Sequence, residues 1–281
     1  MINYKGTLLP EDSPIFDARN RGFTLGDAVY EEIKAVNGQL YFWEDHYLRL
    51  MASMRILRME IPMNFTLEYL EEQIQDLLKA NELQDKPAFV KIYVYRESGS
   101  QLLPEGNEVA FTITTETGKQ PFYTLPEAAY ELELFKDFYI NADMLSNLNT
   151  NNHILSVVGS IFARENGYQD CFLLNAKKNV VSALNGNIFL VQGKQGKTPP
   201  LGDGCKDGIV RKKLLGILKN SEHYQVREES ISPFELQKAD GLFITNIRVG
   251  ILPVTKYRKA EYSGDLAREL IGKLNAAARL G

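Results

Sequence analysis

Three short stretches of the sequence combine residue types that could bind a small anionic molecule. Residues 208–211 (GIVR) open a helical pattern after a glycine-containing loop, and a helix N-terminus offers backbone N–H groups to a phosphate. An ordinary turn gives the same pattern. Arg49 lies beside Leu48 and Leu50 on a predicted helix, where it would hold an anion or form a surface ion pair. Thr245 and Asn246 follow an apolar strand, so they would line a pocket or make a turn.

An asparagine-rich segment, residues 146–152, leads into a predicted helix. Apolar residues at helical spacing follow it, so we expect a buried helix that begins near Asn152 and continues to about Asn166; they are Ile154, Val157, Val158 and Ile161. A polar entry of this kind is either a capped helix start or a functional site.

The remaining candidates for chemistry are weak when they are taken singly. Tyr93 and Arg96 come from a strand and its exit, where a packed aromatic ring and a solvated charge are the alternative. Cys171 lies in an apolar strand without a basic neighbour, which is typical of an unreactive core thiol. The three histidines (His46, His153 and His223) are scattered and no CxxC or HExxH pattern occurs, so we expect no metal site.

The composition is that of an ordinary globular protein. The chain has 281 residues, 44% of them hydrophobic and 24% charged, and its net charge is −4 with both signs interspersed. This balance argues against a nucleic-acid partner, and no apolar run is long enough to span a membrane. The N-terminal residues lack the pattern of a signal peptide, and two cysteines are too few for a disulfide framework. We therefore expect a cytoplasmic protein.

The first part of the chain predicts an α+β domain over residues 1–117 with a largely antiparallel sheet. Residues 2–9 are expected to form one strand. Residues 29–36 and 39–43 form a hairpin around Asn37-Gly38. A helix over 44–57 follows, then a second helix, capped by Asn64 or Thr66, to about Ala80, and strands over 88–95 and 109–115. On the first helix we expect Tyr47, Leu48, Met51, Met54 and Leu57 to face inward.

The second part of the chain predicts a larger domain over residues 127–281, after an interdomain linker over 118–126 that contains glycine and proline. Strands are expected over residues 130–139, 170–174, 180–182, 187–191, 239–245 and 251–254, and helices over 208–218 and 265–278, besides the helix after the asparagine-rich segment. Helices and strands thus alternate in both parts, which indicates an α/β (α+β) fold class.

Taken together and in order, several motifs resemble those of one enzyme family. They are RGFTLGDAVYEEI (21–33), EDHYLRL (44–50), the helix from Asn152 to Ala163 with the residues after it, NIFLV (187–191), TPPLGDGCKDGIVRK (198–212) and LFITNIRVGILPV (242–254). The chain is similar to the fold-type IV, or class IV, aminotransferases over nearly its whole length. Thr245-Asn246 and the non-threonine Val210 resemble the aminodeoxychorismate lyases more than the branched-chain aminotransferases.

The resemblance implies a two-domain fold and pyridoxal 5′-phosphate as cofactor. Arg49 matches the arginine that grips the cofactor phosphate in the family. Ile209 and Val210 match the positions whose backbone amides hold it, and Asn246 and Ile247 match the loop that gives further contacts. Tyr30, Lys91 and Tyr93 match the strands that line the substrate pocket. Family members form homodimers, in which the smaller domain of one subunit helps to build the site of the other.

Three positions depart from the family pattern. Asn149 stands at the position of the Schiff-base lysine, or Leu148 by the spacing of some branches, and no lysine occurs between Lys136 and Lys177. Ser182 stands where the family has the glutamate that pairs with the pyridine nitrogen, and His153 replaces the usual tyrosine. An asparagine amide is neither a nucleophile nor a base, and a serine hydroxyl does not hold a proton on the ring nitrogen at neutral pH. Covalent attachment of the cofactor is therefore not expected.

Three hypotheses follow for the function. The chain is an aminotransferase, or a lyase that converts 4-amino-4-deoxychorismate to 4-aminobenzoate and pyruvate, with another base such as Lys91 in place of the lysine. Alternatively, it is an inactive homologue that binds pyridoxal phosphate or another anionic ligand without a covalent bond. As a third possibility, it serves only as a partner in a dimer.

Overall fold

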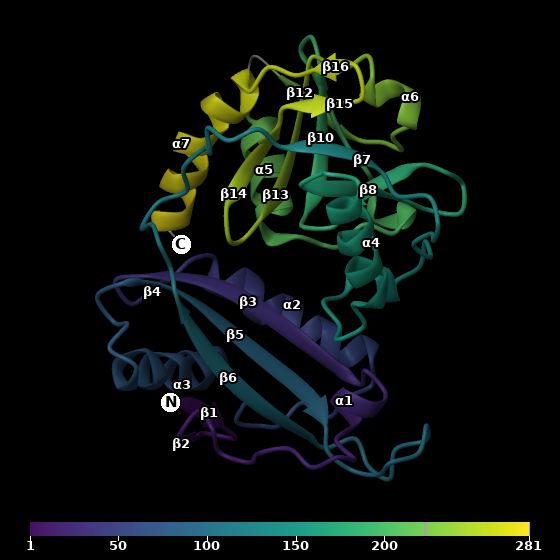
Figure 1. Ribbon diagram of the computed structural model, residues 1–281. Helices are drawn as coiled ribbons and strands as arrows, with labels where there is room; N and C mark the ends of the chain where they lie inside the picture. Colours follow the sequence, from purple (N-terminus) through teal and green to yellow (C-terminus); the bar gives the residue numbers. More distant parts are fainter. Residues whose placement is uncertain (222–223, 281) are drawn as a thin grey trace. The chain divides into compact units, whose positions relative to one another are not determined.

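The computed structural model of the chain describes residues 1–221 and 224–280, so that His223 lies outside the described residues. The contacts between residues divide the chain into two compact units. Unit 1 comprises Met1–Pro121 and Asn149–Asn152, and unit 2 comprises Phe122–Leu148 and His153–Leu280 (Figure 1). No helix in the described part of the chain is both long enough and apolar enough to cross a membrane.

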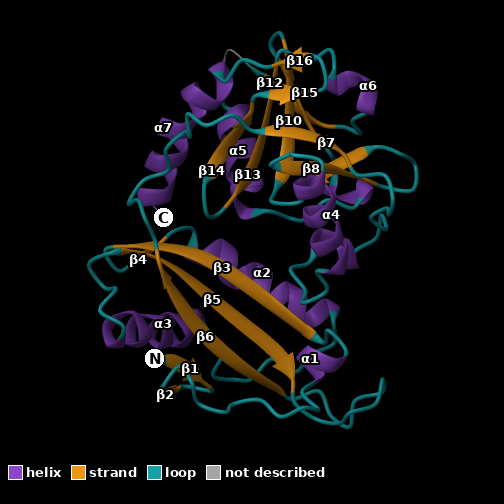
Figure 2. Cartoon of the chain, viewed as in Figure 1, coloured by secondary structure: helices purple, strands orange, loops and turns teal. Residues whose placement is uncertain are grey.

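An antiparallel sheet with the strand order β2-β1-β6-β5-β3-β4 forms the centre of unit 1 (Figure 2). Its strands are β1 (Ile2–Tyr4), β2 (Thr7–Leu9), β3 (Ala28–Val36), β4 (Gln39–Leu40), β5 (Pro87–Arg96) and β6 (Val109–Thr117). The hairpin predicted at Asn37-Gly38 is present, and both residues have a positive φ (51° and 75°), as a tight two-residue turn requires.

Helices cover one face of this sheet. They are α2 (Trp43–Ile56) and α3 (Leu67–Ala80), whereas the short α1 (Arg21–Thr24) lies beside Ala28 and Tyr95. The predicted cap of α3 is confirmed, because the Thr66 hydroxyl accepts the Tyr69 N–H at 3.1 Å. Val29 and Ile33 of β3 pack with Leu50 of α2 in one apolar core, so the other face of β3 carries the side chains at positions 30, 32 and 34.

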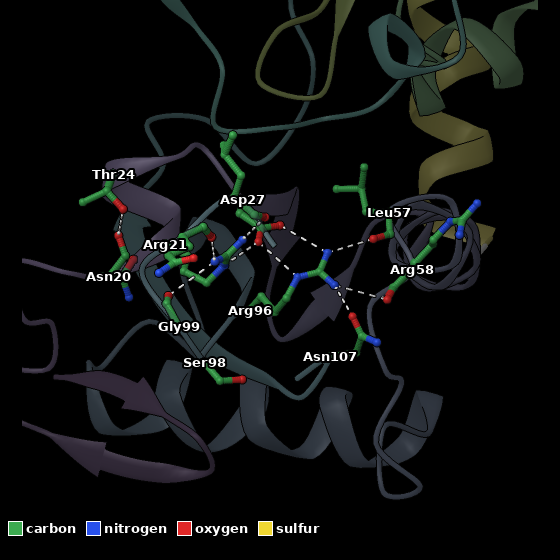
Figure 3. Close-up of polar contacts among 12 residues, drawn as sticks. Asn20, Arg21, Thr24, Asp27, Leu57, Arg58, Arg96, Ser98, Gly99 and Asn107 are labelled. Carbon is green, nitrogen blue, oxygen red and sulfur yellow. Dashed lines mark hydrogen bonds and ion pairs between the residues drawn. The ribbon is translucent and has the colours of Figure 1, made fainter. Parts of the chain in front are cut away.

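Two arginines and one aspartate tie α1, β3 and β5 together in unit 1 (Figure 3). Asp27 accepts hydrogen bonds from Arg21 Nε at 2.8 Å and from Arg96 Nε at 3.0 Å. The remaining guanidinium N–H groups donate to the carbonyls of Gly99 and Leu57 and to other carbonyl oxygens nearby. Arg96 is therefore a buried structural residue, and the alternative of a solvated charge, which the sequence left open, is wrong.

Unit 2 is built on two further sheets. One has the order β12-β11-β10-β13-β14 and the other β16-β15-β7-β8-β9. Their strands are β7 (Glu131–Leu134), β8 (Asp170–Leu174), β9 (Val180–Ala183), β10 (Asn187–Gln192), β11 (Gln195–Thr198), β12 (Gln225–Glu228), β13 (Gly241–Asn246), β14 (Gly250–Val254), β15 (Lys256–Tyr257) and β16 (Ala260–Glu261). The helices are α4 (Ile154–Glu165), α5 (Ile209–Lys219), α6 (Pro233–Leu236) and α7 (Asp265–Leu280), and short 3-10 turns cover Leu145–Asn147 and Leu201–Asp203.

Strand β8 is buried on both faces, which explains its continuous apolar sequence. Phe172 and Leu174 join a core with residues of β10 and β13, whereas Cys171 and Leu173 pack against α4. Both cysteines are buried free thiols, so the prediction of an unreactive core position for Cys171 agrees with the structure.

Several predictions of local structure are wrong. The segment 2–9 is a hairpin of two strands and not one strand, because Gly6 has a φ of 86° and reverses the chain. The strand predicted over 39–43 ends at Leu40, and the strand predicted over 130–139 covers only Glu131–Leu134. Leu48, predicted to face inward, is 54% exposed.

The helix predicted after the asparagine-rich segment is confirmed as α4, but it is not buried all round. Leu155, Val158 and Phe162 pack inward, whereas Ile154, Val157 and Ile161 are exposed; their exposed fractions are 68%, 51% and 41%. The spacing of apolar residues predicted the helix correctly, but it could not show that this second stripe remains open within one chain.

Candidate functional site

The face of β3 and β5 that α2 and α3 do not cover, called the open face below, brings together the three residues predicted to line a substrate pocket. Tyr30 pairs with Tyr93 across the two strands, and Glu32 pairs with Lys91. Lys91 Nζ lies 3.8 Å from Glu32 Oε1, and it lies 5.3 Å and 5.6 Å from the ring centroids of Tyr30 and Tyr93. Burial raises the pKa of Tyr30 to about 12, so its hydroxyl stays neutral. The face therefore presents a cation supported by aromatic rings and a carboxylate.

On the opposite side of β3, a buried carboxylate holds Arg49. Glu31 Oε1 accepts Arg49 Nε at 2.8 Å, and Glu31 Oε2 accepts Arg49 Nη2 and the Nδ1 of His46, both at 2.6 Å. Burial alone would raise the pKa of Glu31, but the Arg49 charge and the two hydrogen-bonding partners lower it. The sequence left open that Arg49 forms a solvated ion pair at the surface. This alternative is wrong, because the carboxylate partner of Arg49 is only 2% exposed.

Lys34 follows Tyr30 and Glu32 on the open face of β3, and it was not predicted from the sequence. Its side chain is almost fully buried and lies 5.9 Å from the centroid of the Phe89 ring. Burial lowers the pKa of Lys34 to about 8. No sequence signal marks it, since an isolated lysine in a strand is usually solvated.

The asparagine-rich segment joins unit 1 through its backbone. The Asn149 carbonyl accepts the Tyr30 N–H at 2.9 Å, and the Asn151 N–H donates to the Ala28 carbonyl at 3.3 Å. Thr150 thereby forms an antiparallel bridge with Val29. The position of Asn149 is thus fixed by main-chain bonds at the start of β3, next to Tyr30. His153 takes the N-cap position of α4 in unit 2, without a side-chain capping bond.

In unit 2, the N-terminus of α5 lies beside the ends of β10 and β13. Asn187 and Thr245 are cross-strand partners, and a Cβ on Gly208 would lie 2.1 Å from Asn187 Oδ1. Ile209 and Val210 are the first residues of α5, and their amides have no acceptor among the described residues. The buried Thr245 hydroxyl also lacks a hydrogen-bond partner in the described part of the chain. This group of donors is suited to an anion.

The turn after β13 holds the other two predicted contacts. Asn246 uses its side chain locally, because Oδ1 accepts the N–H groups of Arg248 and Val249 and Nδ2 donates to the Asn185 carbonyl. The Ile247 carbonyl accepts the Tyr123 hydroxyl at 3.0 Å. The asparagine side chain therefore shapes the turn.

Ser182 lies in β9, opposite Leu173 of β8, and it is 8% exposed. The turn between β9 and β10 is fixed by Asp170, which accepts the backbone N–H groups of Leu184 and Asn185 and the hydroxyl of Tyr130. Ser182 and Asn187, at the two ends of this turn, are thus held in rigid strands.

The sequence matches the family model for amino-transferase class IV over residues 28–257. The chain belongs to this family. The aminodeoxychorismate lyase of Vibrio harveyi is 27% identical over 263 residues, which cover 91% of this chain and 94% of that enzyme.

Solved structures of other class IV aminotransferases share the fold. The branched-chain aminotransferase of Thermoproteus uzoniensis with norvaline has a TM-score of 0.86 at 22% identity, covering 97% of this chain and 92% of that one. The branched-chain aminotransferase of Thermobaculum terrenum in its PLP-form has a TM-score of 0.83 at 19% identity, covering 99% and 96%. The predicted family and the mixed α/β, fold-type IV architecture are confirmed.

Class IV aminotransferases depend on pyridoxal phosphate, and the residues of this chain fit one end of that molecule. The amides of Ile209 and Val210 and the unpartnered Thr245 hydroxyl suit a phosphate. Asn149 and Ser182 do not supply the covalent bond or the carboxylate that the resemblance leads one to expect. The donors at the start of α5 are therefore suited to the phosphate end of the cofactor.

In this class IV chain, Glu31 and His46 were not predicted from the sequence, although a signal for both was present. Glu31 occupies a core-facing position of a strand that is otherwise apolar on that side, and His46 and Arg49 stand three residues apart on the helix that follows. A carboxylate in such a position must find cationic or hydrogen-bonding partners. The two residues of the helix were therefore the candidates to supply them.

Proposed function

We propose that this class IV aminotransferase homologue, related to the aminodeoxychorismate lyases, binds pyridoxal phosphate through its phosphate and does not attach it covalently. The observation that supports the proposal is the combination of an intact phosphate-binding arrangement at α5 with Asn149 at the lysine position. The amides of Ile209 and Val210 and the Thr245 hydroxyl remain available, whereas no lysine occurs between Lys136 and Lys177.

Each unit contributes residues of its own to this proposal. In unit 2, Ile209 and Val210 donate backbone N–H groups, Thr245 donates its hydroxyl, and Asn246 with Ile247 forms the adjoining turn. In unit 1, Arg49 is the arginine that the resemblance assigns to the phosphate.

The residues that the resemblance assigns to the ring and aldehyde of pyridoxal phosphate all differ from those that transamination needs. Bound pyridoxal phosphate supplies an aldehyde and a pyridine ring that withdraws electrons when its nitrogen is protonated. Ser182 can donate a hydrogen bond to an unprotonated nitrogen, but it cannot stabilise a proton there as a carboxylate does. With Asn149 unable to carry a proton and His153 at the tyrosine position, the chain lacks the groups for transamination.

Lys91 is the residue on which the alternative, an active lyase or transaminase, depends. Its amine lies between the carboxylate of Glu32 and the rings of Tyr30 and Tyr93. A carboxylate and two aromatic faces are the partners of a lysine that binds as a cation. The geometry of unit 1 thus supports a role for Lys91 in binding an anionic or amino-acid-like ligand rather than in covalent catalysis.

The test combines binding with chemical trapping. The full chain is equilibrated with pyridoxal phosphate, dialysed, treated with borohydride before or after dialysis, and weighed by intact mass spectrometry. We expect saturable binding that dialyses away and no borohydride-fixed adduct. An adduct on Lys91 or any other lysine would overturn the proposal in favour of an enzyme. Formation of 4-aminobenzoate from aminodeoxychorismate above background would do the same.

Two glycines, one at the N-cap of α5 and one within the helix, provide matched variants for the phosphate contact. Gly208→Ala places a methyl group 2.1 Å from Asn187 Oδ1 and displaces that side chain, which holds the Lys206 carbonyl at 2.8 Å. Gly216→Ala adds a methyl group with no atom within 4 Å. We expect the first change to weaken pyridoxal phosphate binding by about tenfold or more and the second to leave it unchanged. Equal affinities of the two variants would contradict a phosphate site at this helix.

We further propose a homodimer and a cytoplasmic location, on the family resemblance. The apolar stripe of Ile154, Val157 and Ile161 on the outer side of α4 supports an interface, since a helix that is apolar all round is normally covered. Sedimentation analysis of the wild type and of Val157→Asp, which places a charge in the stripe, tests this: we expect a dimer and a monomer, respectively. A monomeric wild type would refute the dimer.

A further inference from the structure

The deepest-lying charged group of unit 1 is the carboxylate of Glu31. Its side chain is 2% exposed, and that of its neighbour His46 is 1% exposed. Leaving such a carboxylate without partners would be costly, so its contacts are expected to be well defined. Three hydrogen bonds reach it from α2: two from Arg49 and one from His46.

The two contacts with Arg49 define the plane of its guanidinium. Glu31 accepts from Nε and Nη2, which is the parallel two-bond arrangement that fixes both the position and the orientation of a planar cation. The Arg49 side chain is 15% exposed, in contrast to its buried partner. One edge of the guanidinium is therefore committed to Glu31, and the group reaches the surface of the unit in a fixed orientation.

His46 fixes the carboxylate in turn. Its Nδ1 lies 2.6 Å from Glu31 Oε2, and its Nε2 is buried without a partner among the described residues. Burial lowers the pKa of His46, so the ring is neutral near pH 7 and its Nδ1 carries the hydrogen that Glu31 accepts. The chain of contacts runs from a buried neutral ring through a buried carboxylate to a partly exposed cation.

We infer that Glu31 is a positioning residue, which orients the Arg49 guanidinium for a phosphate-bearing ligand, and that His46 holds Glu31 in place. The inference rests on the proposed function, because it takes Arg49 as a phosphate-binding residue. It adds a cause for the orientation: a long arginine side chain loses much conformational freedom when it binds an anion, and an arginine already held by a buried carboxylate has lost that freedom in advance. Glu31 thus acts through Arg49 and does not touch the ligand.

The orientation of Arg49 depends on the geometry of the Glu31 carboxylate and not only on its charge. Glu31→Asp keeps the charge but shortens the side chain by one methylene, so that the two bonds to Arg49 cannot both be made. Arg49→Lys keeps the cation but removes the planar two-bond edge. Glu97→Asp is a matched control, because Glu97 is also paired with a cation, Lys5 at 2.9 Å, but it is exposed and makes no contact with Glu31, His46 or Arg49.

The experiment compares the affinities of the full chain for pyridoxal 5′-phosphate and for pyridoxal, which lacks the phosphate. The ratio of the two affinities, measured by equilibrium dialysis, reports the phosphate contribution. A general loss of structure lowers the affinity for both ligands and leaves their ratio unchanged. A misplaced Arg49 lowers only the affinity for pyridoxal 5′-phosphate, so the ratio falls. We expect a lower ratio, by about tenfold or more, for Glu31→Asp and for Arg49→Lys, and an unchanged ratio for Glu97→Asp.

The double variant Glu31→Asp/Arg49→Lys tests whether Glu31 acts through Arg49. If it does, the ratio of the double variant equals that of Arg49→Lys alone, because the positioning residue has nothing left to position. Independent, multiplying effects of the two substitutions would overturn the inference, and so would an unchanged ratio in Glu31→Asp. A wild type that does not prefer the phosphorylated ligand would instead overturn the proposed function, together with the role of Arg49 on which the inference rests.

Discussion

Replacement of Asp27 by asparagine should destabilise unit 1 strongly. Asp27 is the shared partner of Arg21 and Arg96, whose side chains are 3% and 8% exposed (Figure 3). The asparagine keeps the size of the side chain but removes its charge, so two buried guanidinium groups lose the carboxylate between them. Breaking a buried ion pair on one side costs about 3–5 kcal/mol. With a urea dependence of about 2 kcal/mol per molar, the midpoint should fall by about 1.5–2.5 M.

The single tryptophan gives an assay that is specific for this unit. Trp43 is the only tryptophan of the chain, and it belongs to the apolar core of unit 1. Urea titrations followed by its fluorescence therefore report the unfolding of the unit that contains Asp27. Asp17→Asn is the matched control, since Asp17 forms an exposed pair with Arg19 at 3.5 Å, and its loss should change the free energy of unfolding by less than about 0.5 kcal/mol.

The pH dependence of the same transition gives an independent check. Burial alone would raise the pKa of Asp27, but hydrogen bonds and charges from Arg96 and Arg21 outweigh it and lower the pKa in the folded chain. A depressed pKa contributes stability that is complete above the unfolded value of about 3.9 and is lost as the pH falls through the folded value. The difference between wild type and Asp27→Asn should therefore shrink below about pH 4. A cost under about 1 kcal/mol at pH 7, or a difference that does not change with acid, would refute this account of Asp27.

Three further outcomes are expected. Asn149→Lys alone should not give useful turnover of amino acids with pyridoxal phosphate, because Ser182 still lacks the carboxylate; efficient turnover, measured by product formation, would show that the carboxylate is dispensable. Cys171 and Cys205 should not react with Ellman's reagent at pH 8 until guanidinium is added, because burial raises their pKa values to about 12 and about 11, and rapid labelling of the native chain would contradict this. Asp170→Ala should lower the calorimetric melting temperature of unit 2 by several degrees, since it removes the acceptor of the Tyr130 hydroxyl and of the turn after β9; an unchanged transition would refute that role.

Elements with strong local signals could be predicted from the sequence. The hairpin at Asn37-Gly38 and the cap at Thr66 are set by interactions within a few residues, and both are present as expected. The short strands β11, β12, β15 and β16 were missed, because strands of two to four residues carry too little alternation to stand out. The pairings of β12 with β11 and of β15 with β7 also join strands that are distant in the sequence, so no local signal marks them.

In the candidate site, too, the features set by the local sequence could be predicted and those set by distant residues could not. Ile209 and Val210 could be placed at a helix start from the glycine before them, and the structure has α5 begin at Ile209. That the hydroxyl of Thr245 is left without a partner could not be predicted, because this depends on what β10 and α5 bring next to it. The same holds for Lys34, whose lowered pKa comes from its surroundings in three dimensions and not from its neighbours in sequence.

The proposed loss of the family chemistry at Asn149 is compatible with the family fold. The segment around it is attached by its backbone: the Asn149 carbonyl accepts from Tyr30 and the Asn151 N–H donates to Ala28. Main-chain bonds of this kind are indifferent to the side chain at position 149, so a change from lysine to asparagine leaves the bridge to β3 in place. The same reasoning applies to Ser182, which is held in β9 by pairing with Leu173. The main-chain bonds that hold positions 149 and 182 therefore do not depend on the lysine and the carboxylate that the family chemistry would need.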